Sequence, residues 1–554
     1  MIVSSARKQS SFVSHRPKMK GLKPRQKDTH WRALERNGAG CGKQKAMLGG
    51  KVFLVGAGPG DPGLITVRGL EVLARAEVVL TDALAHPALL DACPSAEIRD
   101  VGKRYGEESA SQDAINQELV ALARAGKRVV RLKGGDPLMF ARGGEEALAL
   151  RAAGIDFEIV PGVSSPVAIS AYAGIPLTHR DLSKSVTFIT GSDRAGKEWS
   201  PEAWKKLATA TDTICVLMGM RRLPEIAAAI LEGGRAPETP AAVIQWGTRP
   251  EQRVVTAPLS RIAESTRAAG LKNPAVIVIG DVVGLRESLR WYDSRPLFGK
   301  TLFLPRPAEQ GRVTAHAIRE RGAEPLVIPM IEIAPPPDPA RLDRAIDELD
   351  RYAWVLFTSA NGVERFFRAI ADKGRDARAL GRARVGVIGP KTALALERFG
   401  IRPDLVAREF IGEGLARELV ERAPRGRVLL ARALVARDAL PDALTAAGFE
   451  VDVVPVYETR PASDAVRARL SALLGAGGVD AALFTSSSTV TETLAALGAN
   501  GRDMLAAVTV ASIGPITTRT LEEAGVRVDV TAERYTVDGL LDALEGHISA
   551  AVEL

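Results

Sequence analysis

The sequence predicts an α/β protein with several domains, and three observations support this prediction. The chain has 554 residues, which is too long for one hydrophobic core and suggests roughly three or four units of about 100–200 residues each. From residue 51 to about residue 281, short apolar runs alternate with helical patterns, as they do in layered α/β folds. After residue 300 the sequence repeats itself about 126 residues later, which predicts a duplicated α/β unit.

In the N-terminal half, the apolar runs are short enough to be buried strands, and helical patterns such as 115–125 and 145–152 lie between several of them. The expected strands are 52–55, 78–81, 129–133, 157–160, 186–190, 214–218, 242–245 and 275–279. The following segment, 286–298, is charged, aromatic and interrupted by Pro296, which is typical of a connector between domains.

The repeat in the C-terminal half covers three separate motifs. Residues 301–333 align with 427–459, 356–366 ("LFTSANGVERF") with 483–493 ("LFTSSSTVTET"), and 385–401 with 510–526. Each copy contains a strand, a helix and a strand, followed by "FTS" and "IGP" motifs where a strand ends and a helix begins. Two similar lobes in one chain predict a ligand-binding cleft between them.

The positive charge of the chain is concentrated at its N-terminus. The net charge is +8, and residues 1–48 carry twelve Lys and Arg against only Asp28 and Glu35. A basic segment that lacks an apolar pattern is expected to be a disordered leader, with a nucleic-acid or membrane-surface arm as the less favoured alternative. The remaining chain is slightly acidic, so we expect no nucleic-acid partner.

The cysteines and the hydropathy limit the location of the protein. Cys41, Cys93 and Cys215 lie far apart and show no metal-ligand spacing, which indicates a reducing compartment and no metal site. No apolar stretch approaches about 18 uninterrupted residues, so we expect no membrane span. These features predict a cytoplasmic protein.

The loop "VGAGPGDP" (55–62) directly follows the first expected strand and resembles a nucleotide-binding turn. A dinucleotide fingerprint would place its third glycine at position 61, where this chain has Asp61. Pro59 and Pro62 also remove N–H donors that a phosphate cradle needs. The loop therefore lets the backbone approach a ligand that is not a phosphate, and a purely structural turn is an equal alternative.

Further motifs along the chain favour one interpretation of this turn. "VGKR", "RLKGGDP", "ARGGEE", "PGVSS" and "PLTHR" follow in order, and with the first loop they resemble the tetrapyrrole (corrin/porphyrin) methylase family, specifically its uroporphyrinogen-III C-methyltransferases. The resemblance covers residues 49–285 and implies a two-lobed module that binds S-adenosylmethionine (SAM). Ala83 stands where this family usually has arginine, and Leu217 where many members have tyrosine.

The resemblance also implies roles for particular residues. Asp82 and Lys103 would be the proton acceptor and donor, while Arg142, Glu145 and Arg180 would position the carboxylates of the substrate. An ordinary i, i+3 ion pair is the alternative for Arg142 and Glu145, and core packing is the alternative for Met218. The residues implied for the cofactor site are Pro59, Gly134, Gly135, Asp136, Met139, Ser164, Ser165, Met218 and Gly247.

The duplicated half, residues 299–554, resembles the uroporphyrinogen-III synthase family through "FTSANGVERF", "VPVYETR", "LFTSSST" and "ASIGPITTRTLEEAG". The resemblance implies two flavodoxin-like lobes, one from 299–334 plus 460–554 and the other from 336–458, and no cofactor. Tyr457 would protonate the hydroxyl group that leaves the substrate. The residues implied to bind carboxylates are Arg306, Ser359, Thr392, Arg432, Ser486 and Thr517, for which helix capping is the alternative at the Ser and Thr positions.

Together the two resemblances predict a bifunctional enzyme of tetrapyrrole biosynthesis. The C-terminal half would cyclise hydroxymethylbilane to uroporphyrinogen III, and the N-terminal half would methylate this product at C2 and C7 to precorrin-2, for sirohaem or cobalamin. The alternatives are a methylase for another corrin intermediate and a synthase-like half that only binds tetrapyrrole. The resemblance also implies a homodimer formed through the methylase module.

Overall fold

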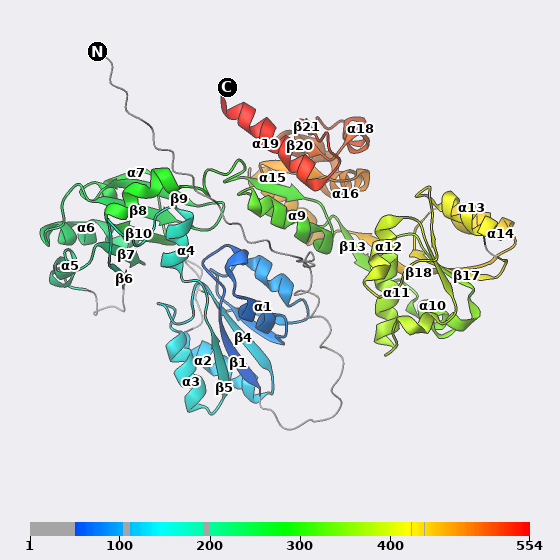
Figure 1. The fold of residues 1–554 in the computed structure, drawn as a ribbon, viewed down its shortest axis with the longest axis horizontal. Helices are drawn as coiled ribbons and strands as arrows, with labels where there is room; N and C mark the ends of the chain where they lie inside the picture. The colour runs from blue at the N-terminus through cyan, green and yellow to red at the C-terminus, as the bar shows by residue number, and fades with distance from the viewer. Residues whose placement is uncertain (1–49, 103–110, 192–198, 423, 437, 554) are drawn as a thin grey trace, which may run out of the picture.

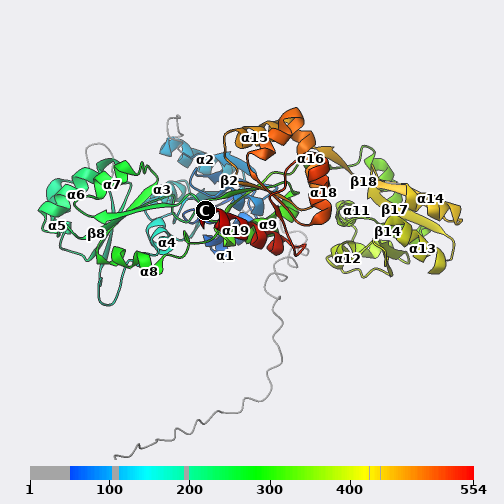
Figure 2. The same ribbon diagram turned by 90° about the horizontal axis from the view of Figure 1, so that it is seen from above.

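The computed structural model describes residues 50–102, 111–191, 199–422, 424–436 and 438–553. These residues form four lobes, each built on a β-sheet with helices packed against it (Figure 1). The four lobes form an elongated molecule, with helices α5–α7 near one end and helices α10–α14 near the other, as Figures 1 and 2 both show. The predicted fold class, two modules of two α/β lobes each, is confirmed.

The first lobe contains a fully parallel five-stranded sheet in the order β3-β2-β4-β1-β5. Its elements are β1 (Lys51–Gly56), α1 (Val67–Leu73), β2 (Val78–Thr81), β3 (Glu97–Asp100), α2 (Gln112–Arg124), β4 (Arg128–Lys133), α3 (Gly143–Ala152) and β5 (Asp156–Val160). Successive residues of β1 enter different cores, because Val52 and Leu54 pack on one face and Phe53 and Val55 on the other. Burial of both faces explains why this strand is continuously apolar.

The second lobe contains a mixed sheet in the order β6-β7-β10-β8-β9. Its elements are α4 (Ser165–Tyr172), β6 (Val186–Thr190), α5 (Pro201–Leu207), β7 (Thr213–Leu217), α6 (Leu223–Glu232), β8 (Pro240–Gln245), β9 (Arg253–Pro258), α7 (Ile262–Ala268), β10 (Ala275–Ile279) and α8 (Arg286–Leu289). Strands β7 and β8 both run antiparallel to β10. They therefore end at the same edge of the sheet.

The third lobe has the parallel strand order β12-β11-β19-β20-β21. Its elements are β11 (Thr301–Leu304), α9 (Ala308–Glu320), β12 (Glu324–Val327), α15 (Asp464–Gly475), β19 (Ala481–Phe484), α16 (Ser487–Leu497), α17 (Gly501–Ala506), β20 (Thr509–Ser512), α18 (Pro515–Glu523), β21 (Val530–Thr531) and α19 (Val537–Glu553).

The fourth lobe is inserted into the third and has the order β13-β18-β17-β14-β15-β16. Its elements are β13 (Ile331–Ala334), α10 (Pro339–Asp347), β14 (Trp354–Phe357), α11 (Ala360–Asp372), β15 (Arg384–Val387), α12 (Pro390–Glu397), β16 (Leu405–Val406), α13 (Gly412–Arg422), β17 (Arg427–Ala433), α14 (Ala439–Ala446) and β18 (Glu450–Pro461). Short 3-10 helices elsewhere are Pro62–Leu64, Pro87–Ala92, Met220–Arg222, Asp281–Leu285, Leu349–Arg351, Ala377–Leu380 and Gly498–Asn500.

The duplication seen in the sequence is also present in the topology. The predicted alignment pairs β11 with β17, β12 with β18, β19 with β14 and β20 with β15, and these partners occupy the same places in their two sheets. Strand β13 pairs antiparallel with the last part of β18, so a two-stranded ribbon connects the third and fourth lobes. The predicted boundaries 299–334, 336–458 and 460–554, like 1–48, 49–285 and 286–298, remain predictions.

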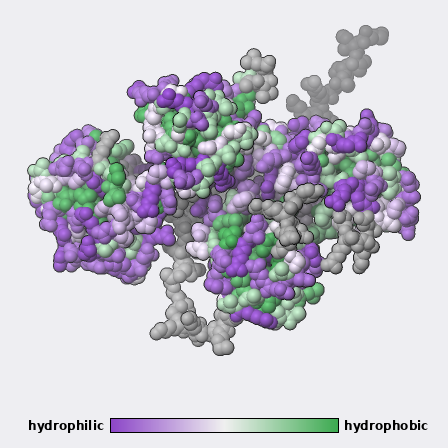
Figure 3. Space-filling model, turned by 180° about the vertical axis from the view of Figure 1, so that it is seen from behind, coloured by the Kyte–Doolittle hydropathy of each residue, from purple (hydrophilic) through white to green (hydrophobic). Residues whose placement is uncertain are grey.

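Two strands of the N-terminal half were not expected, β3 and β9. Both lie at the edge of their sheets, and most of their residues are exposed or half-buried. These two edge strands bury little surface and leave no long apolar run in the sequence, unlike the edge strands β5 and β6, which were expected. The face shown in Figure 3 is mostly hydrophilic with scattered apolar areas. Within the described ranges, no helix has the length and apolar character needed to cross a membrane.

Candidate functional site

Three loops at the carboxyl edge of the first sheet pack directly against one another. The N–H groups of Gly58 and Gly135 donate to each other's carbonyl oxygens, at 3.2 and 2.8 Å, and Ala57 N–H donates to the Lys133 carbonyl at 2.8 Å. A Cβ atom on Gly56 would lie 2.5 Å from Cα of Gly162. The loops therefore require glycine, and these three N–H groups are already used within the protein, unlike those of a phosphate cradle.

Asp61, which interrupts the dinucleotide spacing, connects the first loop to the second lobe. Its Oδ1 accepts a hydrogen bond from Gly63 N–H at 2.7 Å, and its Oδ2 accepts one from the Tyr172 hydroxyl at 2.7 Å. Its own N–H donates to Thr248 Oγ1 at 3.1 Å. Asp61 thus has a structural role in holding the loop against the second lobe.

The predicted cofactor residues of the second lobe follow the ends of β7 and β8. Met218 comes directly after β7 and is 48% exposed, so the core-packing alternative does not describe it. Gly247 follows β8, and a Cβ atom there would lie 2.5 Å from a side-chain carbon of Ile169 on α4. Residues on these two strand ends therefore lie at one edge of the second sheet, and Gly247 packs against the middle of α4.

Backbone strain is concentrated in the same loops. Among the described residues, those other than glycine with a positive φ are Phe140, Arg142, Met218, Trp246 and Thr248. Each costs free energy, on the order of 1–3 kcal/mol, and persists only where the surrounding structure enforces it. Strained residues are found most often at functional sites, which favours these loops as a binding site.

The remaining predicted cofactor residues lie on the loops after β4 and β5. Asp136 joins the two loops, because its Oδ1 accepts from Leu138 N–H at 2.8 Å and its Oδ2 from Gly162 N–H at 3.1 Å. Ser164 occupies the N-cap position of α4 without a side-chain capping bond, and Ser165 is the first residue of the helix. A Cβ atom added to Gly134 would meet Leu84, and one added to Gly135 would lie 3.6 Å from the Ser165 nitrogen. The remaining two predicted residues are Pro59 on the first loop and Met139 on the loop after β4.

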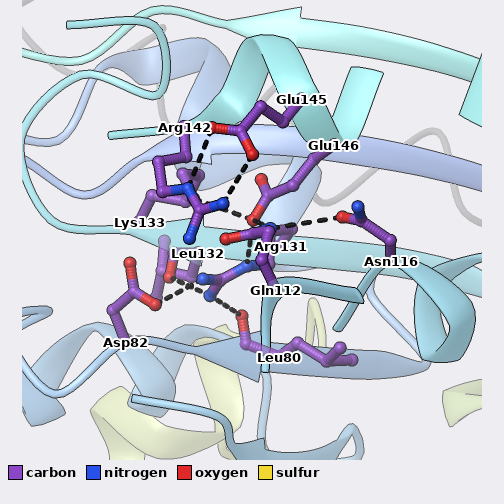
Figure 4. A network of polar contacts seen from close by, with 10 residues as sticks. All are labelled: Leu80, Asp82, Gln112, Asn116, Arg131, Leu132, Lys133, Arg142, Glu145 and Glu146. Carbon is purple, nitrogen blue, oxygen red and sulfur yellow. Dashed lines mark hydrogen bonds and ion pairs between the residues drawn. The ribbon is translucent and has the colours of Figure 1, made fainter. Parts of the chain in front are cut away.

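Asp82 follows β2 at the same edge and contacts a buried arginine. Arg131 is 3% exposed, and its Nη2 forms an ion pair with Asp82 Oδ1 (Figure 4). Arg131 Nη1 also donates to the Leu80 carbonyl at 3.3 Å. Arg131 therefore fixes the carboxylate that the family resemblance implies as proton acceptor.

A buried glutamate on α3, which was not among the predicted site residues, completes this network. Glu146 is fully buried, and its Oε1 accepts from Arg131 Nε at 3.1 Å and Lys133 Nζ at 2.9 Å. Burial, together with the positive charge of Arg131, lowers the pKa of Lys133. The helical pattern of the sequence indicates that Glu146 is buried, because Glu146 lies on the same face of α3 as Ala147 and Leu150.

Arg142 and Glu145 form the ion pair that was the structural alternative. Arg142 Nε and Nη2 donate to the two oxygens of Glu145 at 2.9 and 2.6 Å, and both side chains are partly exposed beside the buried network (Figure 4). Arg180 is exposed in the turn between His179 and Ser183, whose backbones bond to each other. Lys103 lies outside the described residues.

Three predicted residues of the C-terminal half line adjoining cavities in the fourth lobe. Ser359 and Thr392 line a cavity of about 470 Å³, and Arg432 lines one of about 260 Å³. Both cavities share Thr358, Ile388 and Phe410. Arg432 Nη2 also forms an ion pair of 2.6 Å with Asp438. These cavities lie at the carboxyl ends of β14, β15 and β17, where ligands of open α/β sheets bind.

Tyr457 lies where β18 leaves the fourth sheet for the ribbon. It is 7% exposed, and its hydroxyl is 3.1 Å from Ser359 Oγ. Ser359 caps α11 by accepting from Gly362 N–H at 3.0 Å, so its capping role is present. The predicted tyrosine and one predicted carboxylate-binding residue are therefore in contact.

The equivalent residues of the third lobe occupy the corresponding edge of its sheet, but they do not line these cavities. Arg306 donates to Thr314 Oγ1 at 3.2 Å, and burial lowers the pKa of Arg306. Ser486 caps α16, and Thr517 is buried in α18. The structure thus separates the six predicted carboxylate-binding residues into two equivalent sets, one on each lobe.

The repeat also contains an aromatic pair that was not among the predicted residues. Phe410 and Tyr535 lie 125 residues apart, are 62% and 66% exposed, and cover the glycines of the two "IGP" motifs. A Cβ atom on Gly389 would lie 3.2 Å from the Phe410 ring, and one on Gly514 would lie 2.8 Å from the Tyr535 ring. Phe410 and Tyr535 are different residue types, so the repeat does not show their equivalence directly. It could have been found by aligning the Gly-Leu pairs that follow, at 414–415 and 539–540.

Comparison with known proteins finds a match for each half. The family model described as Tetrapyrrole (Corrin/Porphyrin) Methylases matches residues 51–263, and that described as Uroporphyrinogen-III synthase HemD matches residues 312–542. "Porphyrin biosynthesis protein HemD" of Ruminiclostridium josui is 37% identical over 501 residues, which are 90% of this chain and 98% of that protein.

One further relative and one solved structure are also similar to this chain. "Uroporphyrinogen-III C-methyltransferase" of Bacillus subtilis is 38% identical over 382 residues, which are 68% of this chain and 78% of that protein. The crystal structure of uroporphyrin-III C-methyl transferase from Thermus thermophilus, complexed with S-adenosyl homocysteine, is 39% identical with a TM-score of 0.38. The match covers 43% of this chain and 100% of that one.

Proposed function

This chain belongs to the tetrapyrrole methylase family in its N-terminal half and to the uroporphyrinogen-III synthase family in its C-terminal half, and we propose that it catalyses two consecutive steps of tetrapyrrole biosynthesis. The C-terminal half closes hydroxymethylbilane to uroporphyrinogen III with inversion of the last ring. The N-terminal half then methylates uroporphyrinogen III at C2 and C7 and forms precorrin-2.

One observation carries this proposal. The two families match separate parts of a single chain, residues 51–263 and 312–542, and the product of the synthase reaction is the substrate of the methylase reaction. The two matches rest on unrelated motifs, so the agreement between them supports both. A synthase half that only binds tetrapyrrole is the second candidate, because its predicted residues also serve as helix caps.

The loops of the N-terminal half fit SAM as the methyl donor. This ligand carries a sulfonium cation and no phosphate, and the N–H groups of Gly58 and Gly135 are already bonded within the protein. Residues on the facing loops, among them Met218 and Gly247, would hold it. When bound, it supplies an electrophilic methyl group, so the chain needs mainly to align an electron-rich pyrrole carbon and exclude water.

Charged residues of the N-terminal half would then handle the substrate. The guanidinium of Arg142 already forms a bidentate contact with Glu145, the geometry in which it would bind a substrate carboxylate. Arg180, which is exposed, would bind another. Asp82, oriented by Arg131, would accept the proton that leaves the methylated ring, and Lys103 would be the proton donor.

In the synthase half, Tyr457 would protonate the departing hydroxyl group. Its contact with Ser359 places the phenol beside the cavity that Ser359 and Thr392 line. The hydroxyl and N–H groups at the starts of α11 and α12, together with Arg432, would hold carboxylates of the linear tetrapyrrole. Arg306, Ser486 and Thr517 would do the same on the third lobe.

The decisive experiment supplies hydroxymethylbilane with and without SAM and identifies the products. We expect uroporphyrinogen III without SAM and precorrin-2 with it. Formation of only the uninverted isomer I would contradict the synthase function. Formation of isomer III that stays unmethylated in the presence of SAM would contradict the methylase function. The homodimer is a separate proposal, which the molar mass in solution tests.

A further inference from the structure

The segment between the two modules packs against the loops of the methyl-donor site. Tyr292 is 4% exposed, and its ring lies 4.8 Å from that of Tyr172 on α4, measured between ring centroids. Trp291 lies 5.0 Å from the same Tyr172 ring, and its Nε1 donates to the Ala171 carbonyl at 3.0 Å. The segment therefore contacts α4, the helix that begins at Ser164 and Ser165.

Tyr172 belongs to a closed ring of hydrogen bonds that joins the loop after β1 to the loop after β8. Its hydroxyl donates to Asp61 Oδ2 at 2.7 Å, and Asp61 N–H donates to Thr248 Oγ1 at 3.1 Å. Thr248 N–H donates to Gln252 Oε1 at 3.1 Å, and Gln252 Nε2 donates back to the Tyr172 carbonyl at 3.4 Å. The ring fixes the distance between two loops that carry predicted cofactor residues.

Thr248 is the strained member of this ring. Its φ is +70°, a conformation that a β-branched residue rarely adopts, and the side chain is buried. Its Oγ1 and N–H are held within the ring, and its carbonyl oxygen accepts from the Tyr292 hydroxyl at 3.3 Å. Tyr292 therefore supplies the third bond that holds a strained residue next to Gly247, and it also packs on Tyr172.

The same segment is anchored in the synthase module. The Arg295 guanidinium lies over the rings of Trp291 and Tyr292, at 4.8 and 5.2 Å from their centroids, and its Nη1 donates to the Arg319 carbonyl on α9 at 3.0 Å. Leu297 is fully buried in the core of the third lobe. One end of the segment thus supports the methyl-donor loops, and the other end is part of the synthase module.

We propose that Tyr292 is a positioning residue of the methyl-donor site and that the synthase module supports it through Arg295. This inference rests on the proposed function of the N-terminal half. Burial and the neighbouring Asp61 charge raise the pKa of the Tyr292 hydroxyl, so it remains a donor at any working pH. Loss of this donor frees the Thr248 carbonyl and lets the strained loop relax.

The test uses the full chain and titrates S-adenosylhomocysteine by calorimetry. Tyr292→Phe removes the hydroxyl and keeps the ring, so we expect the dissociation constant to rise about 3- to 10-fold, the effect of one neutral hydrogen bond. The KM for SAM should rise by the same factor, with kcat within about twofold and the synthase rate unchanged. Arg295→Ala should weaken binding in the same direction.

Tyr352→Phe is the matched control. Tyr352 is also 4% exposed, and its hydroxyl donates to Asp452 at 2.6 Å in the fourth lobe, far along the chain from the methylase. Wild-type affinity in Tyr292→Phe, or an equal loss in Tyr352→Phe, would overturn the inference. If the wild-type chain failed to bind S-adenosylhomocysteine, the proposed methylase function itself would be overturned before any variant is compared.

Discussion

Replacing Glu146 by glutamine tests whether the buried charge network holds the methylase lobe together. Glu146 Oε1 contacts both Arg131 Nε and Lys133 Nζ, and all three side chains are almost completely buried. Glutamine has the same shape but no charge, so the variant leaves two buried cations with only Asp82 as a counter-ion. Asp82 is 28% exposed and contacts only Arg131 in this network.

The size of the effect follows from burial. Removing one partner of a buried ion pair typically costs about 3–5 kcal/mol, because an uncompensated charge stays in a medium of low polarity. The adjacent Glu145→Gln is the control, since its pair with Arg142 is 39% and 50% exposed. An exposed pair of this kind contributes at most about 1 kcal/mol.

Hydrogen exchange of β4 and α3 amides, followed by mass spectrometry, measures this difference. In Glu146→Gln, the free energy of opening should fall by about 3–5 kcal/mol, which is roughly a 10²- to 5 × 10³-fold faster exchange. Amides of β17 in the synthase half serve as an internal reference and should not change. If β4 exchanges as slowly in Glu146→Gln as in Glu145→Gln, the network does not stabilise this lobe and the reasoning is wrong.

Three further predictions address the two sites. Arg142→Ala should abolish methylation, a loss of at least about 10²-fold, while the affinity for S-adenosylhomocysteine stays within about twofold; loss of that affinity would contradict a role in substrate binding. Gly56→Ala should prevent cofactor binding, because its Cβ would lie 2.5 Å from Gly162 Cα, whereas Gly144→Ala, with no atom within 4 Å, should bind normally in the same titration. Tyr457→Phe should lower the synthase rate by about 10²-fold or more with little change in stability; an unchanged rate of uroporphyrinogen III formation would exclude its hydroxyl as the proton donor.

Most strands of the N-terminal half could be predicted from their apolar residues, including the edge strands β5 and β6, but the edge strands β3 and β9 could not. The expected strands 78–81, 186–190 and 275–279 agree with β2, β6 and β10 to the residue. Strands β2 and β10 lie inside their sheets, so their burial requires a continuous apolar run. Strand β6 lies at an edge, but it still contains Val186, Phe188 and Ile189. Strand β3, with Glu97, Arg99 and Asp100, lies at the edge and contains only one apolar residue.

The sequence predicts features of the candidate site that depend on glycine and proline, because these residues determine the backbone. It predicts less well which charged side chains are buried. Glycines and prolines in the first loop excluded a phosphate site, and the packing of Gly56 against Gly162 agrees with a need for bare backbone. By contrast, Glu145 and Glu146 have the same side chain, and only the helical pattern, which places Glu146 on the face of Ala147 and Leu150, distinguishes them in the sequence. Their roles differ because α3 turns one side chain to solvent and the other towards Arg131, which is a property of packing.

The contrast between these two glutamates explains how one helix start can combine rigidity with exchangeable binding. The Arg142–Glu145 pair is solvent-exposed, so separating it costs little, and an incoming carboxylate can take the place of Glu145 with the same bidentate geometry. The Arg131–Glu146 pair is buried, so no substrate carboxylate can displace it without exposing a desolvated charge. A polyanionic substrate would therefore compete for Arg142 and leave Arg131 with Asp82. If the proposed roles hold, the same cluster of charges would bind carboxylates at its surface while its interior keeps the proposed proton acceptor, Asp82, in place.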